Sequence, residues 1–139
     1  MSSVEECPFC NIGTRALKSN QLAQAFLSNP HKTPGHFLVT PIRHVEKPWE
    51  LTKEEVLCIF DLVNNIEQKL IGSVCDGCDI RQNYRPFLQQ DRTKIDHIHY
   101  HIIPRDNEDH IFQVSETHDN ELWQDLTQTE KDKFTKLLA

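Results

Sequence analysis

Apolar residues recur at three- and four-residue intervals between residues 56 and 70, which is the spacing of one face of an α-helix. Thr52 and Glu55 precede this run with the spacing of a capping box, in which each side chain satisfies a backbone N–H group of the other residue. Gly72 follows the run as a typical helix terminator. The pattern therefore predicts one long helix over residues 52–70. Its repeating residues are Val56, Ile59, Phe60, Val63, Ile66 and Leu70.

Shorter apolar segments bounded by turn-forming residues predict strands. Residues 22–27 and 36–40 flank a loop rich in Ser, Asn, Pro and Gly, so we expect them to pair across a wide turn. A further strand is expected at residues 79–84. Thr127 and Glu130 form a second capping box ahead of a final apolar cluster, which predicts a short C-terminal helix. One long helix against several antiparallel strands is an α+β arrangement.

The most regular pattern lies between residues 96 and 105, where histidines alternate with large apolar residues. Successive side chains of a strand point to opposite faces, so His97, His99 and His101 share one face, with neighbours roughly 7 Å apart. The apolar residues between them share the other face. One face is therefore expected to pack, while the other carries imidazoles that can act as nucleophile, proton carrier or metal ligand near neutral pH.

Composition narrows the class of protein. The chain has 139 residues, which predicts one domain over residues 1–139. A formal net charge of -6 and a pI near 5.7 argue against a general binder of nucleic-acid polymers or membrane surfaces, because phosphate polymers select basic faces. The first seven residues contain neither a basic start nor an apolar run, and no stretch is long enough to span a bilayer. We therefore expect a soluble, cytoplasmic protein.

The five cysteines include two Cys-x-x-Cys pairs, Cys7 with Cys10 and Cys75 with Cys78, and Cys58 stands alone. Without a signal peptide, such pairs favour metal or redox chemistry over a disulfide framework. Thiol–disulfide catalysis is disfavoured because no thioredoxin-like strand and helix surround the first pair.

A tetrahedral zinc site on Cys7 and Cys10 needs two more ligands. The second cysteine pair is one source, and two histidines are the other. Cys78 begins a predicted strand with alternating side chains, and the Asp76-Gly77 pair is a common turn that needs no metal, so the histidines are favoured. Reduced thiols without metal are the remaining alternative.

The run from His97 to Ile103 resembles the signature of the histidine triad (HIT) family of nucleotide hydrolases and transferases. The resemblance extends to Pro34-Gly35-His36-Phe37-Leu38-Val39-Thr40-Pro41 and to Cys7-Pro8-Phe9-Cys10, so it covers nearly everything from Cys7 to Arg105. It implies an antiparallel, meandering sheet of about five strands with one long helix, usually in a homodimer.

The resemblance also implies a ligand set for zinc. Several bacterial HIT proteins, and the related galactose-1-phosphate uridylyltransferases, carry zinc on two N-terminal cysteines, a histidine after the Pro-Gly-His strand and the first triad histidine. The matching residues here are Cys7, Cys10, His44 and His97. With four protein ligands the zinc would be structural, because no position is left for activating a water.

In the family the middle triad histidine attacks the α-phosphorus of a nucleotide, and water or another acceptor resolves the nucleotidyl-histidine. The resemblance thus implies His99 as the nucleophile, a role that suits imidazole because it is unprotonated at one nitrogen near pH 7. His101 is expected to donate a hydrogen bond to the phosphate or the departing oxygen. His97 would orient the strand, and His36 would hydrogen-bond into the row.

The nucleotide-binding residues are expected on both sides of the triad. Residues 81–94 hold four of the chain's 15 basic residues, and Arg92 and Lys94 would place positive charge near the phosphate. Asn83 lies near the place where family members use a polar amide on the ligand. Ser28 replaces an aspartate or asparagine that holds the ribose hydroxyls in many relatives, a departure that leaves the ribose contact open or shifts it to Asn29.

We therefore expect a nucleotide hydrolase or nucleotidyl transferase that acts on the α-phosphate of a dinucleoside polyphosphate or a related adenylylated compound. Arg85, Arg92 and Lys94 favour a polyphosphate leaving group, since guanidinium groups pair with phosphate oxygens. The alternatives are a nucleoside phosphoramidate hydrolase, a nucleotide-binding regulatory module with little turnover, and a zinc-stabilised interaction domain whose histidines all bind metal. Intact second and third histidines favour catalysis.

Overall fold

The computed structural model describes residues 6–139 and divides them into two compact units, residues 6–107 and residues 108–139. The first unit contains β1 (Lys18–Ser19), β2 (Ala23–Leu27), β3 (Phe37–Pro41), α1 (Lys53–Leu70), β4 (Gly77–Arg81), β5 (Tyr100–Arg105) and 3-10 turns at Gly13–Arg15 and Pro48–Glu50. The second contains short helical segments at Phe112–Glu116 and Asp119–Leu122, followed by α2 (Gln128–Leu138). The single domain expected over residues 1–139 stays a prediction.

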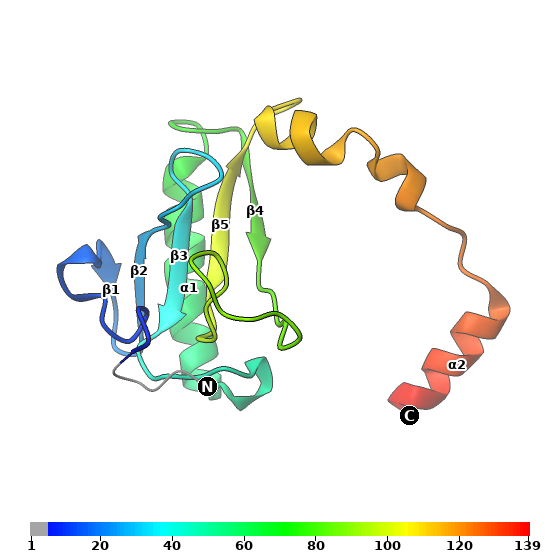
Figure 1. The fold of residues 1–139 in the computed structure, drawn as a ribbon, viewed down its shortest axis with the longest axis horizontal. Coiled ribbons are helices and arrows are strands. Elements are labelled where there is room, and N and C mark those ends of the chain that lie inside the picture. The colour runs from blue at the N-terminus through cyan, green and yellow to red at the C-terminus, as the bar shows by residue number, and fades with distance from the viewer. Residues whose placement is uncertain (1–5) are drawn as a thin grey trace. The chain divides into compact units, whose positions relative to one another are not determined.

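The five strands form one antiparallel sheet in the order β1-β2-β3-β5-β4 (Figure 1). In the register of the three strands at the site, Leu38 on β3 pairs with His101 on β5, and His101 pairs with Arg81 on β4. The fold class and the five-stranded sheet are therefore confirmed. The two-residue strand β1 has no sequence signal of its own and was not predicted.

Two strand boundaries were predicted wrongly. The strand expected at residues 79–84 is β4, which begins and ends earlier, at Gly77–Arg81. The histidine strand begins only at Tyr100, because the Ile98 N–H group bonds to the Val45 carbonyl oxygen at 2.7 Å instead of joining the β3 ladder. His97 and His99 thus lie on the segment that leads into β5, with His101 alone inside it.

The helix α1 begins with the predicted capping box. The Thr52 hydroxyl accepts from the Glu55 N–H group at 3.1 Å, and the Glu55 carboxylate accepts from the Thr52 N–H group at 2.9 Å. Glu55 is almost fully buried and also pairs with Arg43 at 2.7 Å, so the ion pair and the backbone bond together satisfy the buried charge. This carboxylate ties the start of α1 to the segment after β3.

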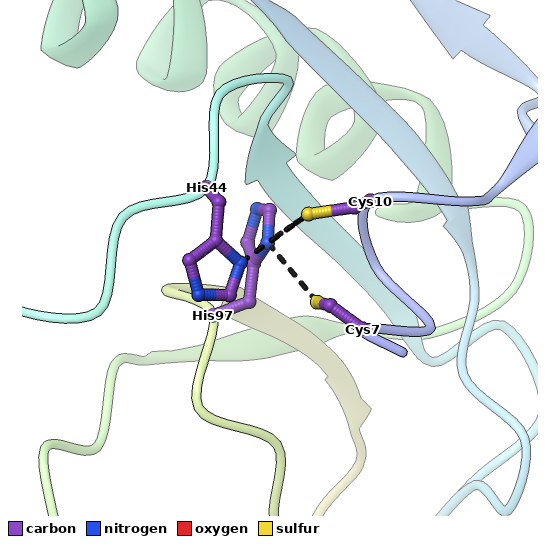
Figure 2. A group of neighbouring side chains, drawn as sticks. All are labelled: Cys7, Cys10, His44 and His97. Atoms are coloured by element: carbon purple, nitrogen blue, oxygen red, sulfur yellow. Dashed lines mark hydrogen bonds between the residues drawn. The ribbon is translucent and has the colours of Figure 1, made fainter. Parts of the chain in front are cut away.

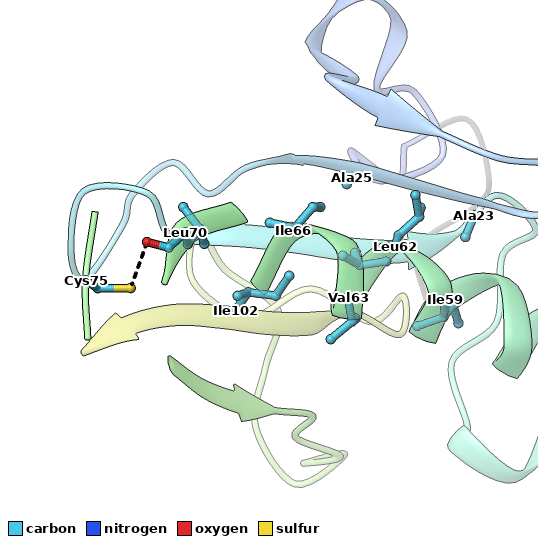
Figure 3. Packing of buried hydrophobic residues seen from close by; sticks show 10 residues of the cluster. Ala23, Ala25, Ile59, Leu62, Val63, Ile66, Leu70, Cys75 and Ile102 are labelled. Carbon is cyan, nitrogen blue, oxygen red and sulfur yellow. Dashed lines mark hydrogen bonds between the residues drawn. The ribbon is translucent and has the colours of Figure 1, made fainter. Parts of the chain in front are cut away.

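One face of the sheet packs against α1 (Figures 1 and 3). The small residues Ala23 and Ala25 let the helix approach β2, and Ile102 fills the space over β5. The helix contributes Ile59, Leu62, Val63, Ile66 and Leu70 to this cluster. Burial of this apolar surface fixes α1 to the sheet and leaves the histidine face on the other side.

The opposite face is covered by the N-terminal segment. Phe26 and Leu38, which are paired across β2 and β3, pack with Cys7, Phe9 and Ile12. The rings of Phe9 and Phe26 meet edge to face with centroids 5.2 Å apart. This second cluster holds the Cys-x-x-Cys segment against the histidine face of the sheet.

In the second unit, α2 begins at the predicted capping box, with Thr127 and Glu130 bonded in both directions. Across residues 6–139, no helix combines the length and apolarity that crossing a membrane requires.

Candidate active site and metal centre

Four side chains from three parts of the chain meet beside the sheet (Figure 2). They are Cys7, Cys10, His44 and His97, and their candidate ligand atoms all lie within 4.8 Å of one another. The Nδ1 atom of His97 lies 3.5 Å from the sulfur of each cysteine, and the Nδ1 atom of His44 lies 3.3 Å from that of Cys10. These four residues are the ligand set that the family resemblance implies.

The orientation of both imidazoles suits metal binding. The Nε2 atom of His97 lies 2.9 Å from the Pro41 carbonyl oxygen, and the Nε2 atom of His44 lies 2.9 Å from the Glu46 carboxylate. Each Nε2–H group therefore has an acceptor, which leaves the Nδ1 lone pair directed at the thiols. Burial lowers the pKa of His97 to about 4, so this ring is neutral near pH 7.

The spacing of the donor atoms fits a tetrahedral ion. A thiolate sulfur about 2.3 Å and an imidazole nitrogen about 2.0–2.1 Å from zinc lie roughly 3.5 Å apart. The sulfur–nitrogen distances of 3.3–3.5 Å agree with that value. The residues thus fit a metal ion of zinc's size and preference for sulfur and nitrogen.

The second cysteine pair lies apart from this cluster. The sulfurs of Cys75 and Cys78 are 3.8 Å from each other, and neither belongs to the group around His97. The alternative site of four cysteines is therefore not present among residues 6–139.

His99 is held in one tautomer. Its Nδ1 atom lies 2.8 Å from the His97 carbonyl oxygen. A carbonyl oxygen can only accept, so Nδ1 carries the proton and Nε2 keeps its lone pair. The Phe9 ring meets the imidazole edge to face at 5.1 Å, and burial lowers the pKa of His99. The side chain is a neutral imidazole with one unprotonated nitrogen, outside the metal cluster.

A chain of hydrogen bonds fixes the tautomers of His36 and His101. The Lys32 N–H group donates to Nδ1 of His36 at 3.1 Å, so the proton of His36 lies on Nε2. That Nε2–H group faces Nδ1 of His101 at 2.9 Å, which leaves the proton of His101 on its own Nε2. His36 therefore hydrogen-bonds into the histidine row, as expected. The Nε2–H group of His101 is the ring donor that this bond does not use.

Both rings of this pair are neutral near pH 7. Burial, together with the nearby Lys32 charge, lowers the pKa of His36 to about 4. Burial and the neighbouring His99 and His36 lower the pKa of His101 to about 3. Since an unfolded histidine takes up its proton near pH 6.5, the unfolded chain binds more protons than the folded chain between about pH 6.5 and pH 4.

The folded state should therefore lose stability as the pH falls through this window. His36→Gln removes one titrating group, so we expect the stability difference between the original protein and the variant to narrow by about 2 kcal/mol from pH 7 to pH 5. Urea unfolding at both pH values, at equal metal content, measures this difference. A matched control is His118→Gln, because His118 is exposed. A stability difference that stays constant or widens at pH 5 would contradict the lowered pKa of His36.

Two cavities meet at His99 and His101, which line both. The larger has a volume of about 470 Å³ and an apolar floor of Phe9, Leu38 and Ile95. The smaller, of about 160 Å³, is lined by the charged side chains of Glu46, Arg85, Lys94 and Asp96.

The cavities divide the predicted nucleotide-binding residues between them. Ser28, Asn29, His36 and Arg92 line the larger cavity, and Asn83 and Lys94 line the smaller one. The expected cluster of positive charge at Arg85, Arg92 and Lys94 is thus divided. Lys94 is also neutralised by an ion pair with Asp96.

Sequence reasoning missed three parts of the site. Glu46 accepts a hydrogen bond from the His44 imidazole and lines the smaller cavity. Its position two residues after His44 could have indicated this hydrogen bond. Arg15 lines the larger cavity from a segment without a motif. The Pro41 carbonyl oxygen orients His97 through a contact between residues 56 positions apart, which no local pattern reveals.

The sequence of residues 11–108, which includes both cavities' central histidines, matches the model of the HIT domain. The chain belongs to the HIT family.

Curated relatives of this HIT protein include two named enzymes from Schizosaccharomyces pombe. The chain is 34% identical over 109 residues to an adenosine 5′-monophosphoramidase, covering 75% of this chain and 77% of that protein. It is 30% identical over 98 residues to an asymmetrical bis(5′-nucleosyl)-tetraphosphatase, covering 70% of this chain and 53%, or about half, of that protein. The expectation of a HIT-type enzyme is confirmed.

Solved structures show the same fold. A HIT family protein from Bacillus anthracis matches with a TM-score of 0.73 and 26% identity over 96% of this chain and 95% of that one. A zinc-bound histidine triad family protein from Mycobacterium smegmatis matches with a TM-score of 0.65 and 25% identity over 78% and 81% of the two chains.

Proposed function

We propose that this HIT protein hydrolyses nucleoside 5′-phosphate derivatives at the α-phosphorus, through a nucleotidyl intermediate on Nε2 of His99. The observation that carries the proposal is the hydrogen bond between His99 Nδ1 and the His97 carbonyl oxygen. It keeps the Nε2 lone pair free at neutral pH. It also places an acceptor beside the ring, which stabilises the positive charge that the imidazole gains when Nε2 bonds to phosphorus.

His101 supports the same step. Its proton lies on Nε2 because Nδ1 accepts from His36, so His101 can donate a hydrogen bond to a phosphate oxygen. The bond from His36 holds the ring in this tautomer throughout the reaction. His101 therefore stabilises developing negative charge, while His99 forms the covalent bond.

The two steps balance in atoms and protons. In the first, the bond from Nε2 of His99 to phosphorus forms, the bond to the leaving group breaks, and an amine leaving group takes up one proton from the solvent. In the second, water attacks phosphorus, releases one proton, and the bond to Nε2 breaks. His99 returns to a neutral imidazole, and a nucleoside monophosphate leaves.

The nucleoside fits the larger cavity and the leaving group fits the smaller. A base can pack on the apolar floor, and Ser28 and Asn29 lie on the same side for the ribose. The α-phosphate then sits at His99 and His101, where the cavities meet. Asn83 and Lys94 lie on the leaving-group side.

An amine is the leaving group that we favour. The smaller cavity holds two acidic and two basic side chains, and Lys94 is already paired with Asp96, so its lining offers little net charge to a polyphosphate. The relative named as a monophosphoramidase agrees with this choice. The second candidate is a dinucleoside polyphosphate, which Arg85 favours, since no carboxylate among residues 6–139 pairs with it.

We also propose that Cys7, Cys10, His44 and His97 hold zinc. When bound, the ion supplies a structural cross-link between the N-terminal segment and the sheet, and it takes no part in the reaction. The homodimer implied by the family stays a prediction, which light scattering of the full chain tests.

Intact-mass measurement under rapid quench, with an adenosine 5′-phosphoramidate and diadenosine tetraphosphate, tests the function. We expect a mass increase of one adenylyl group and a kcat/KM for the phosphoramidate that is about tenfold higher or more. Arg85→Gln should lower turnover of the tetraphosphate alone, because among the described residues of the smaller cavity Arg85 is the cation that no carboxylate neutralises. Absence of turnover with both compounds would refute the enzyme, and faster turnover of the tetraphosphate would establish the second candidate.

A further inference from the structure

The rim of the larger cavity is positively charged, although the whole protein is acidic. Arg15, Lys32 and Arg92 line it, and among residues 6–139 the one acidic residue in its lining is Asp91. The Asp91 carboxylate already accepts from the N–H and hydroxyl groups of Thr93 and from the Lys94 N–H group, at 2.7–2.9 Å. These hydrogen bonds lower the pKa of Asp91 and keep it ionised within its own loop, so the three cations and this carboxylate leave a net charge of about +2 around the cavity.

These cations are arranged around the cavity. The Arg15 guanidinium lies 5.3 Å from the centre of the Phe26 ring, a cation–π contact that holds it near the apolar floor. Arg92 makes a long hydrogen bond of 3.4 Å to the side-chain oxygen of Asn29. Lys32 lies close enough to His36 and His101 for its charge to affect both rings. Within residues 6–139, no carboxylate forms an ion pair with any of the three.

Among residues 6–139, no carboxylate is hydrogen-bonded to the side chains of Ser28 and Asn29. The Ser28 hydroxyl donates to the Pro30 carbonyl oxygen at 2.6 Å, and the Asn29 side-chain oxygen faces Arg92. Unmodified ribose hydroxyls are commonly held by an acidic side chain, whereas arginine accommodates a phosphate at the same position. An arginine, Arg92, lies beside Asn29, which is the arrangement that accommodates a phosphate.

We propose that the larger cavity takes a nucleotide whose ribose carries a second phosphate group, on its 2′ or 3′ oxygen, held by Arg15, Lys32 and Arg92. The inference rests on the proposed function, which places the nucleoside in this cavity. Guanidinium groups pair with phosphate oxygens in a forked geometry, so the two arginines supply directed bonds and Lys32 supplies a point charge. The smaller cavity, with its balanced charges, has no comparable set.

Calorimetric titration of the full chain tests this assignment with four adenosine nucleotides. The ligands are adenosine 5′-monophosphate, adenosine 2′,5′-bisphosphate, adenosine 3′,5′-bisphosphate and adenosine 5′-diphosphate. We expect at least one ribose bisphosphate to bind about tenfold tighter than the monophosphate at low salt, and the advantage to shrink as salt screens these exposed charges.

Variants locate the effect. Arg15→Gln combined with Arg92→Gln should remove the advantage of the bisphosphate, so that the variant binds the bisphosphate and the monophosphate with equal affinity. Arg85→Gln is the matched control, because it removes a cation from the other cavity, and it should preserve the advantage.

Equal affinity for the monophosphate and both bisphosphates would overturn the inference and leave the proposed function intact. So would an equal or larger gain for the diphosphate that disappears in the double variant, since that places the cations beside the phosphate chain. No binding of the monophosphate, with no adenylyl adduct on the protein, would instead refute the proposed function.

Discussion

Replacing His99 with alanine is expected to lower turnover by a factor on the order of 10⁴ or more, with little change in nucleotide affinity. The substitution removes Nε2, the one unprotonated ring nitrogen that the hydrogen bond to the His97 carbonyl leaves free at the junction of the cavities. His99 is half-buried and lies outside the sheet ladder, so its loss does not open the core. Steady-state rates and calorimetric nucleotide binding measure the two effects separately.

The control for this variant is His118→Ala, which changes an exposed histidine and should keep full activity. His99→Gly serves as a second test. If either His99 variant turned over substrate at the original rate, another residue would have to be the nucleophile.

Replacing Cys7 with serine is expected to reduce bound zinc from about one ion per chain to a small fraction, and to lower Tm by on the order of 10 °C. Cys7 is buried, with its sulfur 3.5 Å from Nδ1 of His97. Serine leaves three ligands and puts a hydroxyl into an apolar cluster with Phe9 and Phe26. Elemental analysis and thermal unfolding, with and without added zinc, check both outcomes.

The second cysteine pair supplies the matched control. Cys75→Ser changes a buried cysteine outside the ligand cluster, so metal content should remain near one ion per chain even if Tm falls. His44→Ala should lose metal as Cys7→Ser does. Metal that survives His44→Ala but is lost in Cys75→Ser would establish the site of four cysteines instead.

Local patterns were sufficient for much of this structure. The three- and four-residue spacing identified α1, and both capping boxes formed as expected, because a capping box joins residues only three positions apart. Period-two alternation correctly separated Tyr100 and Ile102, which pack toward α1, from His101 on the opposite face.

The errors arose where distant residues decide the outcome. The start of β5 depends on a bond from Ile98 to Val45, and the sequence around Ile98 contains no sign of it. Counting charges along residues 81–94 also failed to separate Arg92 from Lys94, since the fold places them at different cavities and pairs one with Asp96. Local periodicity fixes which face a side chain takes, whereas partners and cavities depend on tertiary contacts.

The ligand cluster joins residues that are far apart in the chain, and this spacing has a consequence for the order of folding. Cys7 and His97 are 90 positions apart, and Cys10 and His44 are 34 apart. Closing such long loops is entropically costly, so the contacts become favourable only after the strands have brought their ends together. During synthesis, Phe9 and Ile12 have their apolar partners Phe26 and Leu38 available once the first 38 residues are made. The ligand cluster is complete only after His97 is made, so a ribosome-bound chain that stops before residue 97 offers a metal at most three of the four ligands.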